Sequence, residues 1–171
     1  VVKGHPLKYG RWILTPNHIS GWDPICLAAK APRPLHFMAK AELRRFLGPL
    51  LYLLDISPIA RDKPDIRAIR TVRHFLLNEK LVVMYPEGHR YRDGRIGEFR
   101  NGAFYFLRKQ MAPVVPVAIK GLEKLSFTNF WNRHVKIAFL DPIYPVDVIG
   151  MKEEEIASMV RERILEFYNS L

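Results

Sequence analysis

The chain has 171 residues, too few for two ordinary domains with separate cores, so one domain over residues 1–171 is predicted. Its 49% hydrophobic residues exclude a disordered chain, and its single cysteine excludes an internal disulfide framework or a four-cysteine zinc site. With 27 Lys and Arg against 17 Asp and Glu, the net charge of +10 indicates an anionic partner: a phosphate substrate, an acidic carrier protein, an anionic membrane or a nucleic acid. The excess lies before Met111, where 20 Lys and Arg face 9 Asp and Glu, against 7 and 8 from Met111 onward.

Apolar runs along the chain predict six strands. They are expected at Trp12–Thr15, Leu35–Ala39, Ile56–Ala60, Leu81–Tyr85, Val114–Ile119 and Val135–Leu140. Apolar residues at steps of three and four predict amphipathic helices over Pro64–Glu79 and Lys152–Leu171, and Lys120–Arg133 is expected to form a long surface loop. The alternation of strands and helices predicts an α/β fold, with a mixed or mostly parallel sheet flanked by helices.

A membrane-spanning segment is not expected. The most apolar stretch, Phe46–Ala60, is interrupted by glycine, proline and aspartate and falls short of the roughly 18 apolar residues that a span needs. The N-terminus shows no signal-peptide pattern. We predict a peripheral location at the cytoplasmic face of a membrane, through the basic part of the chain before Met111 and the apolar groups Leu50–Leu54 or Phe127–Trp131.

The most informative local pattern is the segment 17–23, which follows the first predicted strand and contains a His-x4-Asp spacing. His18 and Asp23 cannot share one face of a helix, because five residues leave a net rotation of about 140°, so a turn through Ser20 and Gly21 is needed to bring them together. An aspartate paired with the imidazole would fix its tautomer and leave the other ring nitrogen free to take a proton from a hydroxyl. The alternative is that Asp23 caps the helix that follows, with a proline in its first turn, and that His18 is an ordinary turn residue.

A second pattern is the predicted strand that breaks at Pro86 and opens into a polar loop running to Phe99. Arginines and glycines gather in and beside this loop, a composition that brings guanidinium groups and backbone amides to a phosphate; a solvated basic loop is the alternative. They are Arg90, Arg92, Arg95, Arg100, Gly88, Gly94 and Gly97. No GxGxxG or GxxxxGK[ST] nucleotide loop occurs, and without HExxH or a Cys-His set no metal is expected. Cys26, in an apolar run, is expected to be a buried and inert thiol.

In their order along the chain, these segments resemble the glycerolipid acyltransferase family, typified by 1-acyl-sn-glycerol-3-phosphate acyltransferases. Residues 17–23 are similar to the first block, NHxSxxD, and residues 59–62 to the second. Residues 85–91 are similar to the third, FPEGTRS, residues 99–103 to the FKxGA stretch after it, and residues 115–119 to the fourth, a V-P-V strand. The departures are Tyr85 for Phe, His89 for Thr, Tyr91 for Ser and Arg100 for Lys. The usual N-terminal membrane-binding helices of the family have no counterpart before residue 17.

The resemblance implies acyl transfer from a thioester, either acyl-coenzyme A or an acyl carrier protein, to the free hydroxyl of a lysophospholipid, first of all lysophosphatidate. No cofactor beyond this co-substrate is implied. His18 would be the general base and Asp23 would orient it, while backbone amides near residues 87–88 would hold the oxyanion. The substrate-binding residues that it implies are Asn17, Arg61, Glu87, Gly88, His89, Arg90, Arg100, Gly102 and Pro116. Glu87 is expected to orient an arginine or the loop, because its charge repels a phosphate.

Two other functions stay open at this point. The same chemistry on another acceptor (glycerol-3-phosphate, another lysophospholipid or an amino-lipid) is compatible with the departures at His89 and Tyr91. A noncatalytic basic module that binds a membrane or a nucleic acid would account for the charge, but it gives no reason for a His-Asp pair after a strand. A nucleic-acid partner is therefore not expected.

Overall fold

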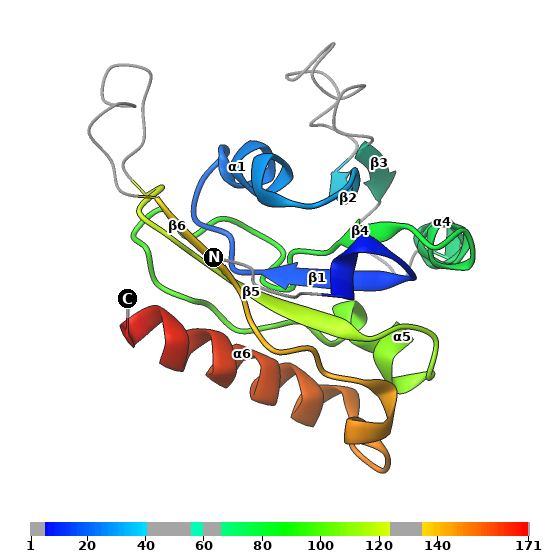
Figure 1. The fold of residues 1–171 in the computed structure, drawn as a ribbon. Coiled ribbons are helices and arrows are strands. Elements are labelled where there is room, and N and C mark those ends of the chain that lie inside the picture. The colour runs from blue at the N-terminus through cyan, green and yellow to red at the C-terminus, as the bar shows by residue number, and fades with distance from the viewer. Residues whose placement is uncertain (1–5, 41–55, 60–65, 124–134, 171) are drawn as a thin grey trace.

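A sheet of six strands runs through the middle of the molecule (Figure 1), in the order β3-β2-β4-β1-β5-β6. The computed structural model describes residues 6–40, 56–59, 66–123 and 135–170. The strands are β1 (Trp12–Pro16), β2 (Leu35–Lys40), β3 (Ile56–Ile59), β4 (Leu81–Val83), β5 (Val114–Lys120) and β6 (Lys136–Phe139). All six lie where the apolar runs predict a strand.

The sheet is mostly parallel. β1 pairs in parallel with β4 on one side and with β5 on the other, and β2 pairs in parallel with β3 and β4. The edge strand β6 pairs antiparallel with β5. Parallel sheets are covered on both faces, which is why the inner strands are continuous apolar runs instead of alternating patterns. The predicted mixed or mostly parallel sheet is confirmed.

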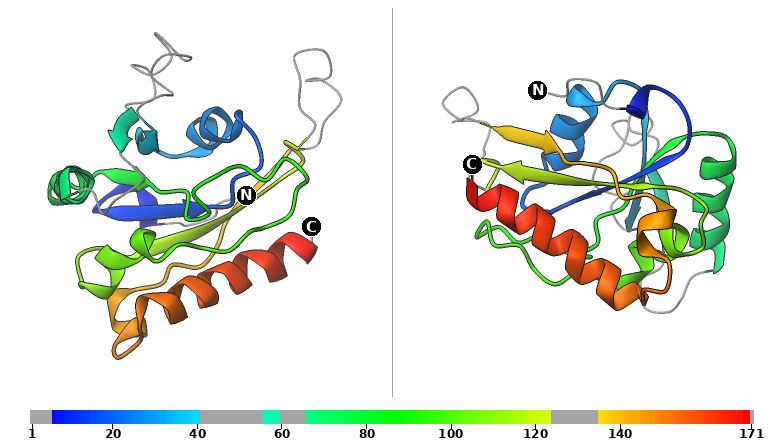
Figure 2. Two further views of the ribbon diagram at one scale, coloured as in Figure 1. Left: turned by 180° about the vertical axis from the view of Figure 1, so that it is seen from behind. Right: turned by 60° about the horizontal axis from the view of Figure 1, so that its bottom comes forward.

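Helices cover both faces of this sheet (Figures 1 and 2). The first, α1 (Asp23–Lys30), packs on one face. The other face carries α4 (Ile66–Leu77), α5 (Tyr105–Arg108) and α6 (Glu153–Ser170), and α6 runs along β5. Among the described residues, short 3-10 helices join the larger elements: η1 (Pro6–Lys8), η2 (Asn101–Ala103) and η4 (Pro145–Val148). The predicted α/β class is therefore confirmed.

The pleat of each strand divides the core into two layers. Along β1, Ile13 packs in the layer shared with α6, and Leu14 packs in the layer shared with α1; neither is exposed. Val160 of α6 and Leu27 of α1 fill the two layers from outside the sheet and are equally buried. Burial of one such side chain contributes about 1.5–3 kcal/mol, so the two layers fix β1 in the centre of the fold.

Some predicted elements differ from the observed ones at their ends. β4 stops at Val83, two residues before the predicted end, and the helix predicted to begin at Pro64 is described from Ile66. α5 follows no periodic pattern, because a helix of 4 residues is too short to show one. Of the surface loop predicted over Lys120–Arg133, residues 124–134 lie outside the described residues.

The carboxyl ends of parallel strands meet at one edge of a sheet, which we call the carboxyl edge. Two irregular segments leave it side by side. Residues 17–23 follow β1 and lead into α1, and we refer to them as the His-Asp turn. Residues 84–100 follow β4 and contain turns but no helix or strand, and we refer to them as the arginine loop.

Candidate active site

The His-Asp turn is closed by one carboxylate oxygen. Oδ2 of Asp23 accepts hydrogen bonds from the backbone N–H groups of Ile19 at 2.8 Å and Ser20 at 3.0 Å, and it lies 2.7 Å from Nδ1 of His18. Asp23 is fully buried. The turn that the His-x4-Asp spacing requires is therefore present, and the side chain of Asp23 faces back into it instead of capping α1.

The geometry of His18 suits a base. A buried carboxylate at Nδ1 favours the tautomer with the proton on that nitrogen, which leaves the lone pair on Nε2. The ring is 15% exposed, and within the part of the chain that the structure describes no hydrogen bond to Nε2 is found. The ring of Tyr85 stacks against the imidazole, with 4.1 Å between centroids and 28° between planes. The imidazole is thus fixed at one nitrogen and open at the other.

The side chain of Asn17, the residue before the histidine, bonds to the backbone of β5. Its Nδ2 donates to the carbonyl of Ile119 at 2.9 Å, and its Oδ1 accepts from the N–H of the same residue at 2.7 Å. The side chain is fully buried. These bonds join the end of β1 to β5, so the amide of Asn17 positions the turn, and a contact between Asn17 and substrate stays a prediction.

Glu87 joins the arginine loop to the His-Asp turn. Its Oε1 accepts a hydrogen bond from the backbone N–H of His18 at 2.9 Å, and its Oε2 accepts from the N–H of Gly97 at 3.4 Å. The N–H of Tyr91 donates to the carbonyl of His18 at 2.8 Å. Both backbone groups of His18 are therefore held by the loop, and Glu87 orients the loop as the sequence predicts, without being available to a substrate.

Burial raises the pKa of Glu87 from 4.5 to about 7. The N–H groups of His18 and Gly97 oppose this shift, Asp23 adds to it, and Arg161 opposes it, since each either favours or disfavours the carboxylate form. Glu87 is 1% exposed. A carboxyl group with this pKa changes between its protonated and ionised forms near neutral pH, beside the candidate base.

Tyr85 is enclosed behind the histidine. Burial raises the pKa of its hydroxyl well above the ordinary value, and Asp23 and Cys26 add to the shift. No described residue makes a hydrogen bond to this hydroxyl. Cys26 itself is half-buried, and burial followed by the charge of Asp23 raises the pKa of its thiol, which agrees with an inert side chain.

Two predicted arginines pack on glycines of the site. A methyl group built on Gly21 would lie 3.1 Å from Nη1 of Arg90, so this guanidinium lies over the His-Asp turn. A methyl group built on Gly88 would lie 2.9 Å from Nε of Arg100, and Gly88 has a φ of +75°, a conformation that suits glycine. Both arginines are exposed. The structure thus brings Arg90 to the turn and holds Arg100 against the loop.

Two of the three departures from the family pattern in the third block contact one another. The rings of His89 and Tyr91 lie 4.3 Å apart with 50° between their planes. The guanidinium carbon of Arg95 lies over the ring of Tyr91, 4.6 Å from its centroid. His89 is exposed and Tyr91 is half-buried, so the substitutions form one aromatic surface on the arginine loop.

The remaining predicted residues lie elsewhere. Pro116 is buried in β5 opposite Thr15, inside the sheet, and its contact with substrate stays a prediction. Gly102 is exposed in η2, which packs beside α6. Arg61 lies outside the described residues, as do the apolar groups Leu50–Leu54 and Phe127–Trp131.

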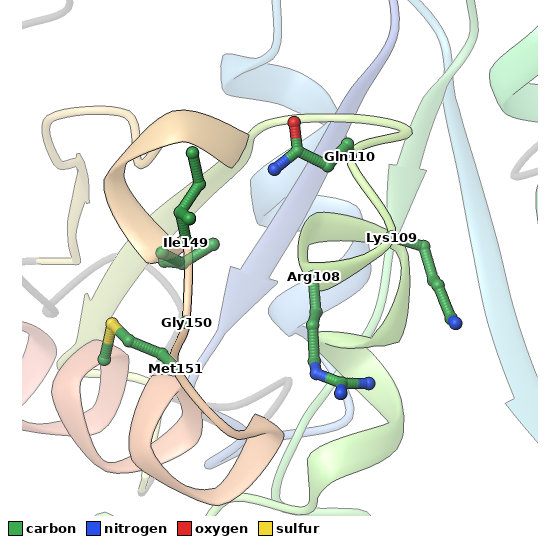
Figure 3. Close-up of a pocket in the computed structure, with 7 residues that line it drawn as sticks. Arg108, Lys109, Gln110, Ile149, Gly150 and Met151 are labelled. Carbon is green, nitrogen blue, oxygen red and sulfur yellow. The ribbon is translucent and has the colours of Figure 1, made fainter.

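A separate pocket lies at the opposite edge of the sheet (Figure 3). It is lined by Arg108, Lys109, Gln110, Val148, Ile149, Gly150 and Met151. The ring of Tyr144, just before η4, contacts Trp12, the first residue of β1, with 6.0 Å between centroids, whereas His18 lies beyond the other end of that strand. Nη1 of Arg108 lies 3.1 Å from Oε1 of Glu153, so this guanidinium already forms an ion pair. This pocket is not part of the His18 site.

The described ranges contain no cluster of three or more His, Cys, Asp or Glu side chains placed to hold a metal ion. Among the described helices, none is both long enough and apolar enough to span a bilayer.

Comparison with known proteins agrees with this site. A family model described as Acyltransferase matches residues 2–120, which include the His-Asp turn and the whole arginine loop. The chain belongs to the acyltransferase family.

Relatives and a solved structure support the assignment. The chain is 28% identical over 178 residues to a probable 1-acyl-sn-glycerol-3-phosphate acyltransferase of Mycoplasma genitalium, covering 92% of this chain and 66% of the relative. It is 32% identical over 130 residues to the human 1-acyl-sn-glycerol-3-phosphate acyltransferase beta, covering 72% and 45% of the two chains. The crystal structure of the 1-acyl-sn-glycerophosphate acyltransferase PlsC from Thermotoga maritima superimposes with a TM-score of 0.72 and 26% identity, covering 95% of this chain and 66% of that one. The chain spans about two thirds of the length of the Mycoplasma and Thermotoga proteins.

Sequence reasoning missed two residues of this acyltransferase site. Tyr85 had a signal, since it ends an apolar run and stands where the family pattern has phenylalanine. Arg161 had no such signal. It lies in α6, 64 positions along the chain from Gly97, and a local sequence pattern cannot predict a contact between residues so far apart.

Proposed function

We propose that this acyltransferase moves a fatty acyl group from a thioester to the free hydroxyl of 1-acyl-sn-glycerol-3-phosphate, forming phosphatidate. The observation that carries the proposal is the buried Asp23 carboxylate at Nδ1 of His18, with Nε2 of the same ring left open. The printed activities of the relatives support this acceptor.

In the proposed reaction, Nε2 of His18 takes the proton of the acceptor hydroxyl while its oxygen forms a bond to the thioester carbonyl carbon. The Asp23 carboxylate, 2.7 Å from Nδ1, stabilises the imidazolium that forms. The carbonyl oxygen carries the negative charge until the carbon–sulfur bond breaks, and the leaving thiolate then takes the proton from the imidazolium. The step as written uses no acyl-enzyme, and its only co-reactant is the thioester.

The acceptor phosphate belongs, in this proposal, beside the His-Asp turn. The guanidinium of Arg90 supports this position because it lies over Gly21 within the turn. A guanidinium fork meets two oxygens of a phosphate dianion, where a lysine meets one. Arg100 and Arg61 complete the proposed basic site. The N–H of Gly88 already donates to the carbonyl of Tyr85 at 3.2 Å, so the oxyanion is assigned to other groups of the loop.

The acyl donor is either acyl-coenzyme A or an acyl carrier protein, and both are compatible with the basic charge of the chain before Met111. Another acceptor with the same chemistry is a second candidate, which the aromatic pair His89 and Tyr91 favours because it stands where the family pattern has threonine and serine. A noncatalytic basic module is less well supported, since it leaves the fixed tautomer of His18 without a purpose.

A peripheral association with an anionic lipid surface is part of the proposal. Helix α4 supports it, because Ile66 and Leu77 are 62% and 58% exposed on a helix that has no acidic residue. Arg67, Arg70 and Arg73 are exposed on the same helix. Exposed apolar side chains among arginines are typical of helices that lie in a membrane interface.

Thiol release from acyl-coenzyme A or acyl carrier protein tests the activity. Release by the wild-type protein should depend on lysophosphatidate, and His18→Ala should lower the turnover by roughly 10² to 10⁴-fold because the general base is lost. His74→Ala, an exposed histidine on α4, is the matched control. A folded His18→Ala protein with more than about a tenth of wild-type turnover would remove His18 from the role of base.

Cosedimentation with liposomes tests the membrane association. Binding should be stronger to anionic than to zwitterionic lipid and should weaken with salt. Replacing Arg70 and Arg73 with glutamine should reduce binding to anionic lipid. Equal binding of both proteins to both lipids at every salt concentration would contradict the electrostatic part of the proposal.

A further inference from the structure

The guanidinium group of Arg161, on helix α6, donates hydrogen bonds to the arginine loop. Nε of Arg161 donates to the carbonyl of Gly97 at 2.7 Å, and Nη2 donates to the carbonyl of Ile96 at 3.1 Å. Arg161 is half-buried, so water competes less for these two bonds than it would on an open surface. The fork of one arginine therefore holds two consecutive residues of a loop that has no regular structure of its own.

Gly97 is held from three sides. Its carbonyl accepts from Arg161, its N–H donates to Oε2 of Glu87 at 3.4 Å, and a methyl group built on it would lie 2.1 Å from Cε2 of Tyr91. The close approach of the Tyr91 ring leaves no room for a side chain at this position. The backbone of Gly97 is thus fixed between α6 and Glu87.

Glu87 continues the connection to the base. Its other oxygen accepts the N–H of His18 at 2.9 Å, so three successive hydrogen bonds join α6 to the backbone of the histidine. A carboxylate has acceptor sites on both oxygens, whereas a protonated carboxyl group presents an O–H on one of them. The ionised form of Glu87 therefore accepts these two N–H groups better than the protonated form does.

We propose that Arg161 is a positioning residue for acyl transfer: by holding residues 96 and 97 it keeps the Glu87 carboxylate on the backbone of His18 and so directs Nε2 at the acceptor. This inference rests on the proposed function. Arg161 lies beyond residue 120, where the match to the family model ends, so the family pattern does not point to it.

The charge of Arg161 acts in the same direction as its hydrogen bonds. Burial is the main cause of the raised pKa of Glu87, and of the two charged side chains that act on it Asp23 raises the pKa further while Arg161 lowers it. Loss of the guanidinium therefore favours protonation of Glu87 near neutral pH. A residue that merely stabilised the fold would not move the pH at which activity is lost.

Kinetics of three variants test this role. Arg161→Gln removes the charge and the fork, Arg161→Lys keeps the charge, and Arg163→Gln, an exposed arginine on the same helix, is the matched control. In Arg161→Gln we expect kcat to fall by about 10 to 100-fold, as for a misplaced catalytic group, with the KM for both substrates nearly unchanged. The acid limb of its pH profile should move to higher pH. In Arg161→Lys the acid limb should return to the wild-type pH, but kcat should recover only in part. Arg163→Gln should match the wild type in both.

Hydrogen exchange, measured by NMR for single amides, tests the same connection without relying on activity. The amides of His18 and Gly97 should exchange faster in folded Arg161→Gln than in Arg163→Gln, by about tenfold or more. Unchanged exchange at His18 would overturn the inference, as would an active Arg161→Gln protein with wild-type kcat and pH profile. If Arg161→Gln does not fold, Arg161→Lys decides: wild-type kcat with wild-type exchange would overturn the role. A wild-type protein that transfers no acyl group, while the variant still shows faster exchange, would contradict the proposed function and leave the connection standing.

Discussion

The His-Asp turn and the arginine loop hold the same histidine in two different ways. In the turn, one oxygen of Asp23 fixes the ring and closes the backbone through residues at most five positions away. In the loop, Glu87 holds the backbone of His18 from 69 positions away and depends in turn on α6. The first arrangement is complete within one short segment, whereas the second exists only after the sheet and α6 have come together.

This difference separates two functions. The turn sets which nitrogen of the imidazole is free, which is a question of chemistry, and a change there should abolish the reaction. The loop sets where that nitrogen points and what charge surrounds it, so changes there should alter substrate affinity, pH dependence or stability by smaller amounts. Variants of the two segments test this distinction.

Asp23→Asn should have the largest effect. An amide in place of the carboxylate no longer stabilises the imidazolium and favours the wrong tautomer of His18, so we expect kcat to fall by roughly 10² to 10⁴-fold. Circular dichroism should show a folded protein. Asp141→Asn, an exposed aspartate, is the control. Turnover above about a tenth of the wild-type value would show that His18 does not need this partner.

Arg90→Lys should act on affinity. A lysine offers a point charge where the guanidinium offers a fork, so we expect the KM for the phosphate-bearing acceptor to rise by about tenfold while the KM for the donor stays nearly constant. Steady-state kinetics with each substrate varied in turn give the two constants, and Arg92→Lys is a control on the same loop. A rise in the donor KM instead would assign this basic site to a phosphate of coenzyme A or of the carrier's phosphopantetheine. The same change is predicted for Arg61→Lys.

Glu87→Gln should change how stability depends on pH. The folded state raises the pKa of this carboxyl from 4.5 to about 7, so between these two values the native protein binds the proton more tightly than the unfolded chain does. The free energy of unfolding should therefore fall as the pH rises from about 4.5 to 7. Urea unfolding across this range should show that Glu87→Gln lacks this fall, whereas Glu98→Gln, which is exposed, keeps it. Parallel curves for Glu87→Gln and the wild type would contradict the raised pKa.

Tyr85→Phe should have the smallest effect. It keeps the ring that stacks on His18 and removes a buried hydroxyl with no described partner. Because an unsatisfied buried polar group costs about 1–3 kcal/mol, we expect the free energy of unfolding to rise by about 1 kcal/mol. Tyr9→Phe, at an 81% exposed position, should leave the stability unchanged. A loss of stability in Tyr85→Phe would show that the hydroxyl has a partner.

The sequence predicts the parts of the fold that depend on local pattern. The six strands are continuous apolar runs, and the acidic start and apolar face of α6 predict that helix to within one residue at each end. The His-Asp turn is equally local, but its spacing alone also fits a helix cap at Asp23, and the family resemblance is what favours a pair between His18 and Asp23. The family resemblance adds the arginine loop as a region of function, without its conformation.

The rest depends on distant contacts. Asn17 and Pro116 are part of family blocks, yet the sheet encloses both, and burial between neighbouring strands cannot be read from either segment alone. Glu87 presents the same case, because its partner at position 18 is brought near by the pairing of β1 with β4. Arg161 requires the packing of α6 as well. Residues that position the site are therefore harder to predict than those that react.

The amide of Asn17 acts as a substitute for a peptide group. It donates to the carbonyl of Ile119 and accepts from its N–H, so both backbone groups of this residue of β5 stay paired where the chain turns away to present His18. Such mimicry leaves little choice of side chain. Aspartate lacks the donor, and glutamine carries the same amide one methylene too far, so either would leave a backbone group of Ile119 unsatisfied inside the sheet. The freedom of the chain to leave the sheet and form a reactive turn thus depends on one short carboxamide.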